Sequence, residues 1–377
     1  MACVLPSIRR RARCVTSIGR VGLISPYDLA VPGGVQAQVR AISTGLLRRG
    51  CDVVVVSPGE RTDDSLAAAG VEHLVGGRTL KVGANGSVAP ITLSLLAARR
   101  AAGALEDRAL DVVHLHEPLT PTLGYSILRR HATPLVGTFH RSGVDLLYRS
   151  AGRFLQRMVG NLDEVVAVSD AAAATARQTC AVDPVILFNG FDIDAHQNAL
   201  PVINAGPTIL FLGRDEPRKG RQVLIEAARY LDPSVTIELT GEPAPVPQGG
   251  AQLEFLGTIS EEEKLRRLLG ADVLCAPSLG GESFGMVLIE GLASSCRIVA
   301  SDIDGYRQAL NGHGLLARPG DPVALAVALS ESLAMTDAED LTKGLAHAQH
   351  WSIDALVDEY LSVYERAVES GGRRLPG

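Results

Sequence analysis

The sequence of 377 residues lacks the features that mark several specialised classes of protein. It has no run near the ~18 consecutive apolar residues that a membrane-spanning helix requires. Its six cysteines are scattered with no C-x-x-C pair, which argues against a disulfide framework or a cysteine-rich zinc site. The net charge of −6 gives no overall attraction to nucleic acid. We therefore expect a cytoplasmic protein with reduced thiols and no nucleic-acid partner.

The remaining composition is that of an ordinary globular protein, with 46% hydrophobic and 21% charged residues. A chain of this length exceeds what one hydrophobic core usually serves, so we expect two domains. Residues 1–19 are rich in arginine and contain no acid, and we expect them to form a disordered basic extension. A targeting peptide is the alternative, which the lack of an apolar segment after the arginines disfavours.

Residues 20–198 alternate between strand-like and helix-like segments, which is typical of a Rossmann-like domain. Short apolar runs indicate strands at 21–25, 51–57, 111–116, 135–139, 164–169 and 184–188. Apolar spacing predicts helices at 35–49 and 91–110, with another after Ser169. The loop after Ile24 lacks G-x-G-x-x-G, so a nicotinamide-dependent enzyme is disfavoured. Its glycine pair, Gly33 and Gly34, suits a phosphate or a plain tight turn equally well.

A second alternation of the same kind follows a linker at residues 191–207, which show no periodicity. Strands are indicated at 208–213, 235–240, 253–257, 271–277 and 297–301, and Ser260 is placed to cap a helix. We assign residues 199–350 to the second domain and expect residues 351–377 to form a helix that crosses back to the first. The predicted fold class is α/β, with two Rossmann-like domains facing a central cleft, where ligands prefer to bind.

Three cations, Arg214, Arg218 and Lys219, lie directly after the strand at 208–213. Loops at the carboxyl ends of parallel strands carry ligand sites. An arginine fork and the point charge of Lys219 would together hold a diphosphate. A solvated basic turn is the alternative, and the position at a strand end favours phosphate binding.

Residues 279–293 run from a glycine turn into a helix and carry two carboxylates, Glu282 and Glu290. Their separation along a helix is roughly 12 Å, which argues against the paired carboxylates of a glycosidase. Two separate contacts to ligand hydroxyls fit better, one to a sugar at the turn and one to a ribose further along. Two surface glutamates are the alternative, which does not explain a Gly-Gly-Glu sequence at a tight turn.

Histidines form a third candidate group. His114 and His116 alternate along one strand and resemble a metal pair, but packed or hydrogen-bonded histidines are the better explanation without a third ligand nearby. His140 follows the strand at 135–139, at the edge where parallel sheets bind ligands, and is a candidate for chemistry. The D-x-D pairs at 192–194 and 302–304 are short, common patterns, so we assign no metal site and Mg²⁺ is not implied.

Together these stretches resemble a known family. Residues 280–290, with Gly213-Arg214 and Arg218-Lys219-Gly220, resemble the signature of retaining glycosyltransferases of the GT-B fold. Further stretches are similar to actinobacterial phosphatidylinositol alpha-mannosyltransferases, and they lie at 26–27, 31–36, 85–89, 114–118, 138–140, 215–220 and 279–285. The match covers essentially the whole chain after the arginine-rich arm.

The resemblance implies GDP-mannose as the donor substrate and no required cofactor. The implied donor-binding residues are Gly34, Arg214, Lys219, Ile259, Glu261, Lys264, Glu282, Phe284, Gly285, Met286 and Glu290. The implied catalytic residues are His140, Arg214, Lys219 and Glu282, with Arg214 and Lys219 clamping the diphosphate. Glu261 stands where the family usually has Asp, which leaves a UDP-sugar open as the donor.

The resemblance also implies phosphatidylinositol as the acceptor, bound by Tyr27, Gln36 and Asn85 at the cytoplasmic face of the plasma membrane. Peripheral membrane contact is also expected, although this chain has fewer basic residues after Arg99 and Arg100 than the basic helix of the family. A different lipid, a sugar or a small metabolite remains open as the acceptor. A catalytically silent sugar-nucleotide-binding protein also remains open, although the intact candidate residues argue against it.

Overall fold

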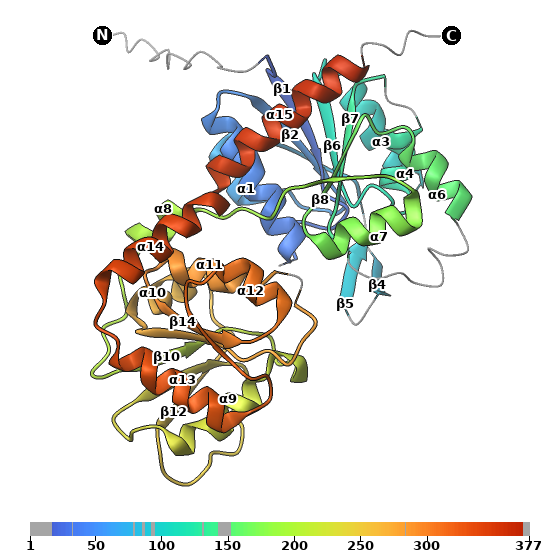
Figure 1. The fold of residues 1–377 in the computed structure, drawn as a ribbon. Coiled ribbons are helices and arrows are strands. Elements are labelled where there is room, and N and C mark those ends of the chain that lie inside the picture. The colour runs from blue at the N-terminus through green and yellow to red at the C-terminus, as the bar shows by residue number, and fades with distance from the viewer. Residues whose placement is uncertain are drawn as a thin grey trace, which may run out of the picture. The chain divides into compact units, whose positions relative to one another are not determined.

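The computed structural model describes residues 17–31, 33–77, 80–84, 87–91, 95–129, 132–141, 152–282 and 284–371. The chain divides into two compact units (Figure 1). Unit 1 comprises the residues up to Gly190 together with those from Ile353 onward, and unit 2 comprises Phe191–Ser352. Most of the predicted basic extension, residues 1–16, and the predicted acceptor residue Asn85 lie outside the described residues.

Unit 1 is built on a parallel sheet in which seven described strands have the order β3-β2-β1-β6-β7-β8-β9. These strands are β1 (Arg20–Ile24), β2 (Asp52–Ser57), β3 (Glu72–Val75), β6 (Val112–His116), β7 (Leu135–Phe139), β8 (Glu164–Ala167) and β9 (Val185–Ile186). Most are apolar on both faces, as expected for strands covered on each side. The sequence did not predict β3, because two residues of this four-residue edge strand are polar and none is buried.

Helices cover both faces of this sheet. They are α1 (Gly34–Arg48), α2 (Asp64–Ala69), α3 (Leu95–Glu106), α4 (Leu123–Leu128), α6 (Gly152–Val159), α7 (Asp170–Cys180) and α15 (Ile353–Gly371). One core lies under α1, α2 and α15, and the other lies under α3, α4, α6 and α7. A separate antiparallel pair joins β4 (Leu80–Ala84) and β5 (Ser87–Ile91). The predicted helix at 91–110 is therefore too long, because residue 91 belongs to β5 and α3 ends at Glu106.

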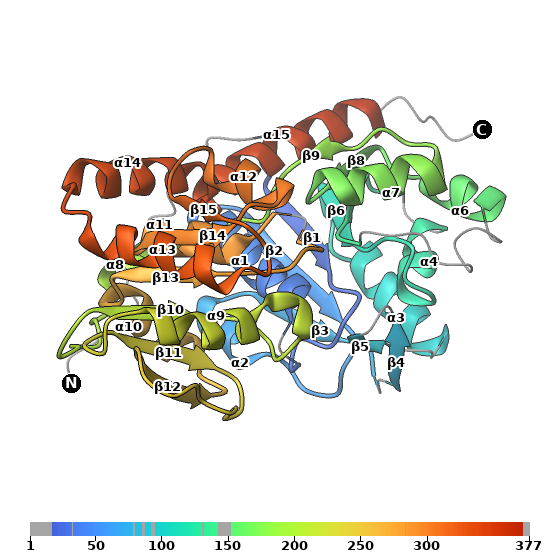
Figure 2. The ribbon, with the colours of Figure 1, turned by 60° about the horizontal axis from the view of Figure 1, so that its bottom comes forward.

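Unit 2 contains a second parallel sheet with the strand order β12-β11-β10-β13-β14-β15, whose strands lie edge to edge in Figure 2. Its strands are β10 (Thr208–Phe211), β11 (Thr236–Thr240), β12 (Gln252–Gly257), β13 (Val273–Ala276), β14 (Arg297–Ser301) and β15 (Leu315–Ala317). The predicted linker at 191–207 is partly wrong, because it contains the short helix α8 (Ile193–Asn198). Asp192 caps this helix by accepting a hydrogen bond from the Ala195 amide. A helix of six residues is too short to show a period in the sequence.

The remaining helices of unit 2 pack around this sheet. They are η1 (Pro217–Lys219), α9 (Arg221–Ala227), η2 (Ala228–Tyr230), α10 (Glu261–Gly270), α11 (Met286–Ala293), α12 (Asp304–Leu310), α13 (Pro322–Ala334), α14 (Ala338–Ala348) and η3 (Gln349–Trp351). The core under α9 and α13 fills one face of the sheet, while α10 and α11 contact its strands β10, β13 and β14. Ser260 caps α10 through the Glu263 amide, as the sequence predicts.

In each sheet the chain adds strands first on one side of its first strand and then on the other. We call the place where it changes side the reversal point. In unit 1 the strand β1 pairs with β2 on one side and with β6 on the other. In unit 2 the strand β10 pairs with β11 and β13 in the same way. Loops that follow these strands splay apart, which is where open α/β sheets bind ligands. The predicted fold class of two Rossmann-like domains is confirmed.

Candidate functional site

Two loops meet at the reversal point of unit 2, one after β10 and one after β13. The Leu279 amide donates a 2.7 Å hydrogen bond to the Arg218 carbonyl, which joins the loops directly. Gly220 has φ of +70°, and a Cβ there would lie 1.8 Å from the Pro277 carbonyl oxygen. Only glycine permits this backbone contact, since both the dihedral and the space exclude a side chain. Local backbone geometry thus sets the position of Arg218 and Lys219 relative to the glycine turn.

Replacing Gly220 with alanine should therefore destabilise unit 2 by roughly 3 kcal/mol or more, because the strained dihedral and the clash add together. Gly249 provides a matched control, since its φ is +75° but nothing lies within 4 Å of its Cβ position. Gly249→Ala should cost only about 1 kcal/mol. Urea unfolding of the two variants measures the difference. Equal losses would contradict a special role for the contact between Gly220 and Pro277.

Five charged side chains form a chain of ion pairs across these loops. Glu216 accepts from Arg214 (3.1 Å) through one oxygen and from Arg218 (2.8 Å) through the other. Glu282 accepts from Arg218 at 2.5 Å and from Lys219 at 2.8 Å, both through Oε1. The Arg214 side chain is 70% exposed, whereas that of Glu282 is only 13% exposed. The structure thus brings three predicted residues into one connected group.

This arrangement suits a phosphorylated sugar. Because both cations bind Oε1 of Glu282, Oε2 has no partner among the described residues and can accept from a ligand hydroxyl. Three cations against two carboxylates leave a net positive charge, which favours a diphosphate next to that hydroxyl. The exposed Arg214 and the partly exposed Lys219 can exchange their carboxylate partners for phosphate oxygens.

The second carboxylate of the motif, Glu290, lies on α11 and pairs with Lys264 of α10. The Lys264 ammonium contacts Glu290 at 3.2 Å and Glu261 at 2.7 Å. Burial raises the pKa of Glu290, and the nearby Lys264 partly offsets this. Burial alone would lower the pKa of Lys264, but the carboxylates of Glu290 and Glu261 outweigh it and raise that pKa. Ile259 lies half-buried just before α10. This group gathers the residues that we expected at a ribose and a base.

The glycine turn ends where α11 begins at Met286. Gly285 has φ of +97°, and a Cβ there would lie 2.5 Å from the ring of Tyr306, so the site requires glycine. Phe284 is buried, with its ring centroid 5.5 Å from that of Trp351. No described side chain caps α11, so amides of its first turn remain available to a ligand. Ser283 lies outside the described residues.

Unit 1 carries its candidate residues at the carboxyl ends of the neighbouring strands β1, β6 and β7. Glu117, buried directly after β6, accepts a 2.6 Å hydrogen bond from the His140 amide after β7. Tyr27 follows β1, and burial together with the nearby carboxyl of Glu117 raises its pKa to about 12. Burial also raises the pKa of Glu117, while backbone amides of His140 and Arg141 act against it. The structure therefore places Tyr27 and His140 around one buried carboxyl group.

The histidines of this edge are hydrogen-bonded to one another and to the core. His116 Nδ1 lies 2.8 Å from His140 Nε2. The ring nitrogens of His114 bond the Tyr364 hydroxyl (2.8 Å) and the Thr138 hydroxyl (2.7 Å). Within the part of the chain that the structure describes, no three potential ligands cluster to hold a metal ion. The contacts of His114 and His116 agree with the explanation that they are hydrogen-bonded histidines.

Two predicted residues of unit 1 lie at the start of α1. Gly34 is the first residue of the helix, and nothing lies within 4 Å of the position its Cβ would take. The chain itself therefore does not require glycine at this position, although a closely approaching ligand would. Gln36 is buried and donates to the Asp28 carbonyl at 3.5 Å. The aspartates of the two D-x-D patterns have structural partners, since Asp192 caps α8 and Asp302 and Asp304 pair with Arg307.

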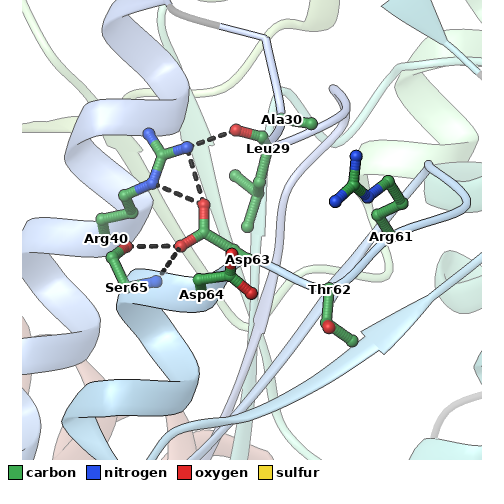
Figure 3. A pocket seen from close by; sticks show the side chains of 8 residues that line it. All are labelled: Leu29, Ala30, Arg40, Arg61, Thr62, Asp63, Asp64 and Ser65. Atoms are coloured by element: carbon green, nitrogen blue, oxygen red, sulfur yellow. Dashed lines mark hydrogen bonds and ion pairs between the residues drawn. The ribbon is translucent and has the colours of Figure 1, made fainter.

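An open pocket of about 520 Å³ also lies in unit 1, beside the loop that leads into α2 (Figure 3). Arg40 on one wall bonds both Asp63 and the Leu29 carbonyl, so its guanidinium is already occupied. Arg61 lies on the opposite wall. No predicted site residue that the structure describes lines this pocket.

Sequence reasoning missed two carboxylates and undervalued one cation. Glu216 and Arg218 connect Arg214 to Glu282, yet the sequence indicated only Arg218, as one of three cations suited to a diphosphate. Glu117 accepts from the His140 amide and helps raise the pKa of Tyr27, whereas the sequence indicated only that a strand ends there. A signal was present in each case, because all three lie in loops that follow strands at a reversal point.

Comparison with known families covers most of the chain. Residues 32–195 match the family described as Glycosyltransferase Family 4, and residues 206–335 match the one described as Glycosyl transferases group 1. The chain is 35% identical to a phosphatidyl-myo-inositol mannosyltransferase of Propionibacterium freudenreichii, over 92% of this chain and 94% of that protein. It is 34% identical to the enzyme of the same name from Mycobacterium tuberculosis, over 94% and 98% of the two chains.

Solved structures show the same fold at lower identity. A glycosyltransferase from Rickettsia africae superposes with a TM-score of 0.71 at 18% identity, covering 94% of this chain and 99% of the other. This similarity concerns the fold alone.

Proposed function

Since the chain belongs to the glycosyltransferase family of the phosphatidyl-myo-inositol mannosyltransferases, we propose that it transfers mannose from GDP-mannose to phosphatidylinositol. The observation that carries this proposal is identity of 32–35% to several such enzymes over nearly the whole chain. The uninterrupted series of ion pairs from Arg214 to Lys219 in unit 2 supports it. A protein that had lost catalytic activity would be expected to have lost one or more of these residues.

In this proposal unit 2 binds the donor from end to end. Glu282 accepts from mannose hydroxyls through Oε2, while Arg214 and Lys219 bind the diphosphate. The backbone of Phe284, Gly285 and Met286 approaches the same sugar phosphate at the start of α11. At the other end Glu290 holds the ribose, and Ile259, Glu261 and Lys264 contact the guanine.

Gly34, at the start of α1, is also proposed to contact the donor phosphates. Unit 1 otherwise carries the acceptor groups, and Tyr27, Gln36 and Asn85 would bind the inositol ring. Support comes from the polar edge at β1, β6 and β7, where Glu117 accepts from the His140 amide, and burial together with Glu117 raises the pKa of Tyr27. The intact group of residues argues against a silent binding protein.

The proposed chemistry retains the configuration of the sugar without a protein nucleophile. The bond between the anomeric carbon and the diphosphate oxygen breaks as the inositol oxygen bonds to the same face of the sugar. The acceptor proton passes to the departing diphosphate. Lys219 and Arg214 stabilise the negative charge that develops on that diphosphate. No step requires a metal ion.

A lipid acceptor implies peripheral contact with the cytoplasmic leaflet of the membrane. None of the described helices is both long and apolar enough to cross a bilayer. On α3 the side chain of Leu96 is 60% exposed, and Arg99 and Arg100 are exposed as well. An apolar side chain beside two cations is suited to an anionic surface. We assign α3 this role at the inner face of the plasma membrane.

Thermal unfolding with nucleotide sugars tests the donor assignment. A ligand that binds the folded protein stabilises it by mass action, by about 2.7 kcal/mol at a concentration 100 times its Kd. GDP and GDP-mannose should raise the melting temperature, whereas UDP- and ADP-sugars at equal concentration should leave it nearly unchanged. Selective stabilisation by UDP-sugars would overturn the guanine assignment, and no response to any nucleotide would favour a silent protein.

A further inference from the structure

His116 occupies an unusual position between a buried cluster and a candidate reactive residue. Its side chain is only 1% exposed, at the end of β6. Nδ1 lies 2.8 Å from Nε2 of His140, and the ring stacks on that of His114 with centroids 4.4 Å apart. Its other nitrogen, Nε2, has no hydrogen-bond partner among the described residues. The ring is therefore held in one orientation with only His140 as a polar neighbour of its nitrogens.

These contacts decide where the protons lie. A buried N–H without an acceptor costs more than a buried lone pair without a donor, and orphaned N–H groups are accordingly rare. The proton of neutral His116 is therefore on Nδ1, and Nε2 carries the unpaired lone pair. Nδ1 of His116 then donates to Nε2 of His140, which must accept. A neutral His140 can accept there only if its own proton is on Nδ1.

We propose that His116 is a positioning residue that fixes His140 as the Nδ1–H tautomer, so that His140 acts on the substrates as a hydrogen-bond donor and not as a base. The role of His140 toward the substrates rests on the proposed sugar transfer. The assignment of its tautomer does not depend on that function. Nothing in the sequence separates His116 from a packed histidine, because the assignment depends on which nitrogen faces which partner.

The surroundings keep both rings neutral, which the assignment requires. Burial lowers the pKa of His140 to about 4 and that of His116 well below its usual value. His114, stacked on His116, is also shifted to a pKa of about 3 by burial. At neutral pH the choice of tautomer is therefore the only protonation variable at His140.

The tautomer limits what His140 can do. Its single lone pair lies on Nε2 and is used by His116, so no lone pair remains to take a proton from the acceptor hydroxyl. Nδ1–H can instead donate to an oxygen of the donor or acceptor. The acceptor proton must leave by another route, and the departing diphosphate of the proposed reaction provides one.

Nitrogen NMR on protein labelled with ¹⁵N-histidine tests the proposal without any substrate. We expect a protonated, pyrrole-type Nδ1 and an unprotonated, pyridine-type Nε2 for His140 at pH 7. The signals are assigned by their loss in His140→Ala. A proton on Nε2 of His140, or on both of its nitrogens, overturns the proposal whether or not the protein transfers mannose. Failure of mannose transfer with the expected tautomer would overturn only the proposed function.

Two substitutions of His116 separate its hydrogen bond from its bulk. In His116→Asn the side-chain amide can donate from nearly the position of Nδ1, so the tautomer of His140 should persist. In His116→Leu the donor is gone, and His140 should become a mixture of tautomers while kcat/KM falls about tenfold. An unchanged tautomer in His116→Leu would overturn the proposal.

Tyr364→Phe is the matched control within the same cluster. It removes a buried hydrogen bond to His114 but touches neither His116 nor His140. We expect lower stability, with the tautomer of His140 and the kcat of folded enzyme retained. If Tyr364→Phe shifted the tautomer as much as His116→Leu does, the effect would belong to the cluster as a whole and the assignment to His116 would be wrong.

Discussion

Replacing Lys219 with alanine should lower kcat by about two to three orders of magnitude, because its ammonium stabilises charge that appears on the leaving diphosphate. Its Nζ lies 2.8 Å from Glu282, and its side chain is 20% exposed, so it can reach both the carboxylate and a bound ligand. Interactions that strengthen in the transition state affect kcat more than substrate binding. The KM for the donor should therefore change far less than kcat. Steady-state kinetics with purified protein measures both values.

Lys343→Ala serves as the control for this variant. Lys343 also pairs with a glutamate at 2.8 Å in unit 2, but its side chain is 61% exposed and its partner Glu339 lies on the same helix. Its loss should leave kcat unchanged. A normally folded Lys219→Ala enzyme with undiminished turnover would contradict the proposed role of Lys219.

Replacing Glu282 with alanine should lower kcat/KM for the donor by about 100-fold, since two functions are lost at once. The variant removes the oxygen proposed to bind mannose, and it removes the carboxylate shared by Arg218 and Lys219. Lys219 would lose its carboxylate partner while Arg218 would keep Glu216, so the folded state should also lose roughly 1–2 kcal/mol. Kinetics and urea unfolding on the same preparation give the two effects separately.

Glu282→Gln divides the two functions of this residue. Glutamine retains an oxygen that accepts from a hydroxyl but loses the charge that pairs with the cations. We expect a loss of kcat/KM between those of the wild type and Glu282→Ala. Activity in Glu282→Gln as low as in Glu282→Ala would show that charge, and not acceptance from a hydroxyl, is what the donor requires.

The fold was largely predictable because buried parallel strands have a simple signature. The strands at 135–139 and 297–301 match their predicted bounds, since each is a compact apolar run. Elements without a sufficient apolar pattern escaped prediction, such as the polar edge strand β3 and the short helix α8. In those elements tertiary pairing or a single capping carboxylate supplies what the sequence pattern lacks.

The sequence predicts at which strand ends the candidate site residues lie, but not which of their side chains pair with one another. Strand-end placement identifies Arg214, Lys219 and His140 from sequence, because topology fixes that edge of the sheet. It does not show that Arg218 and Lys219 share one oxygen of Glu282, or that His116 faces His140. Such details depend on backbone contacts like that of Gly220 with Pro277, which span residues distant in sequence.

Direct transfer to phosphatidylinositol is the measurement that tests the central claim. The purified protein would be incubated with GDP-mannose and phosphatidylinositol vesicles, and the lipids analysed by mass spectrometry, with Lys219→Ala as the inactive control. We predict a phosphatidylinositol that carries one mannose, formed together with GDP and absent in the control. Unmodified phosphatidylinositol, with the sugar transferred to a different acceptor or with no GDP released, would contradict the account.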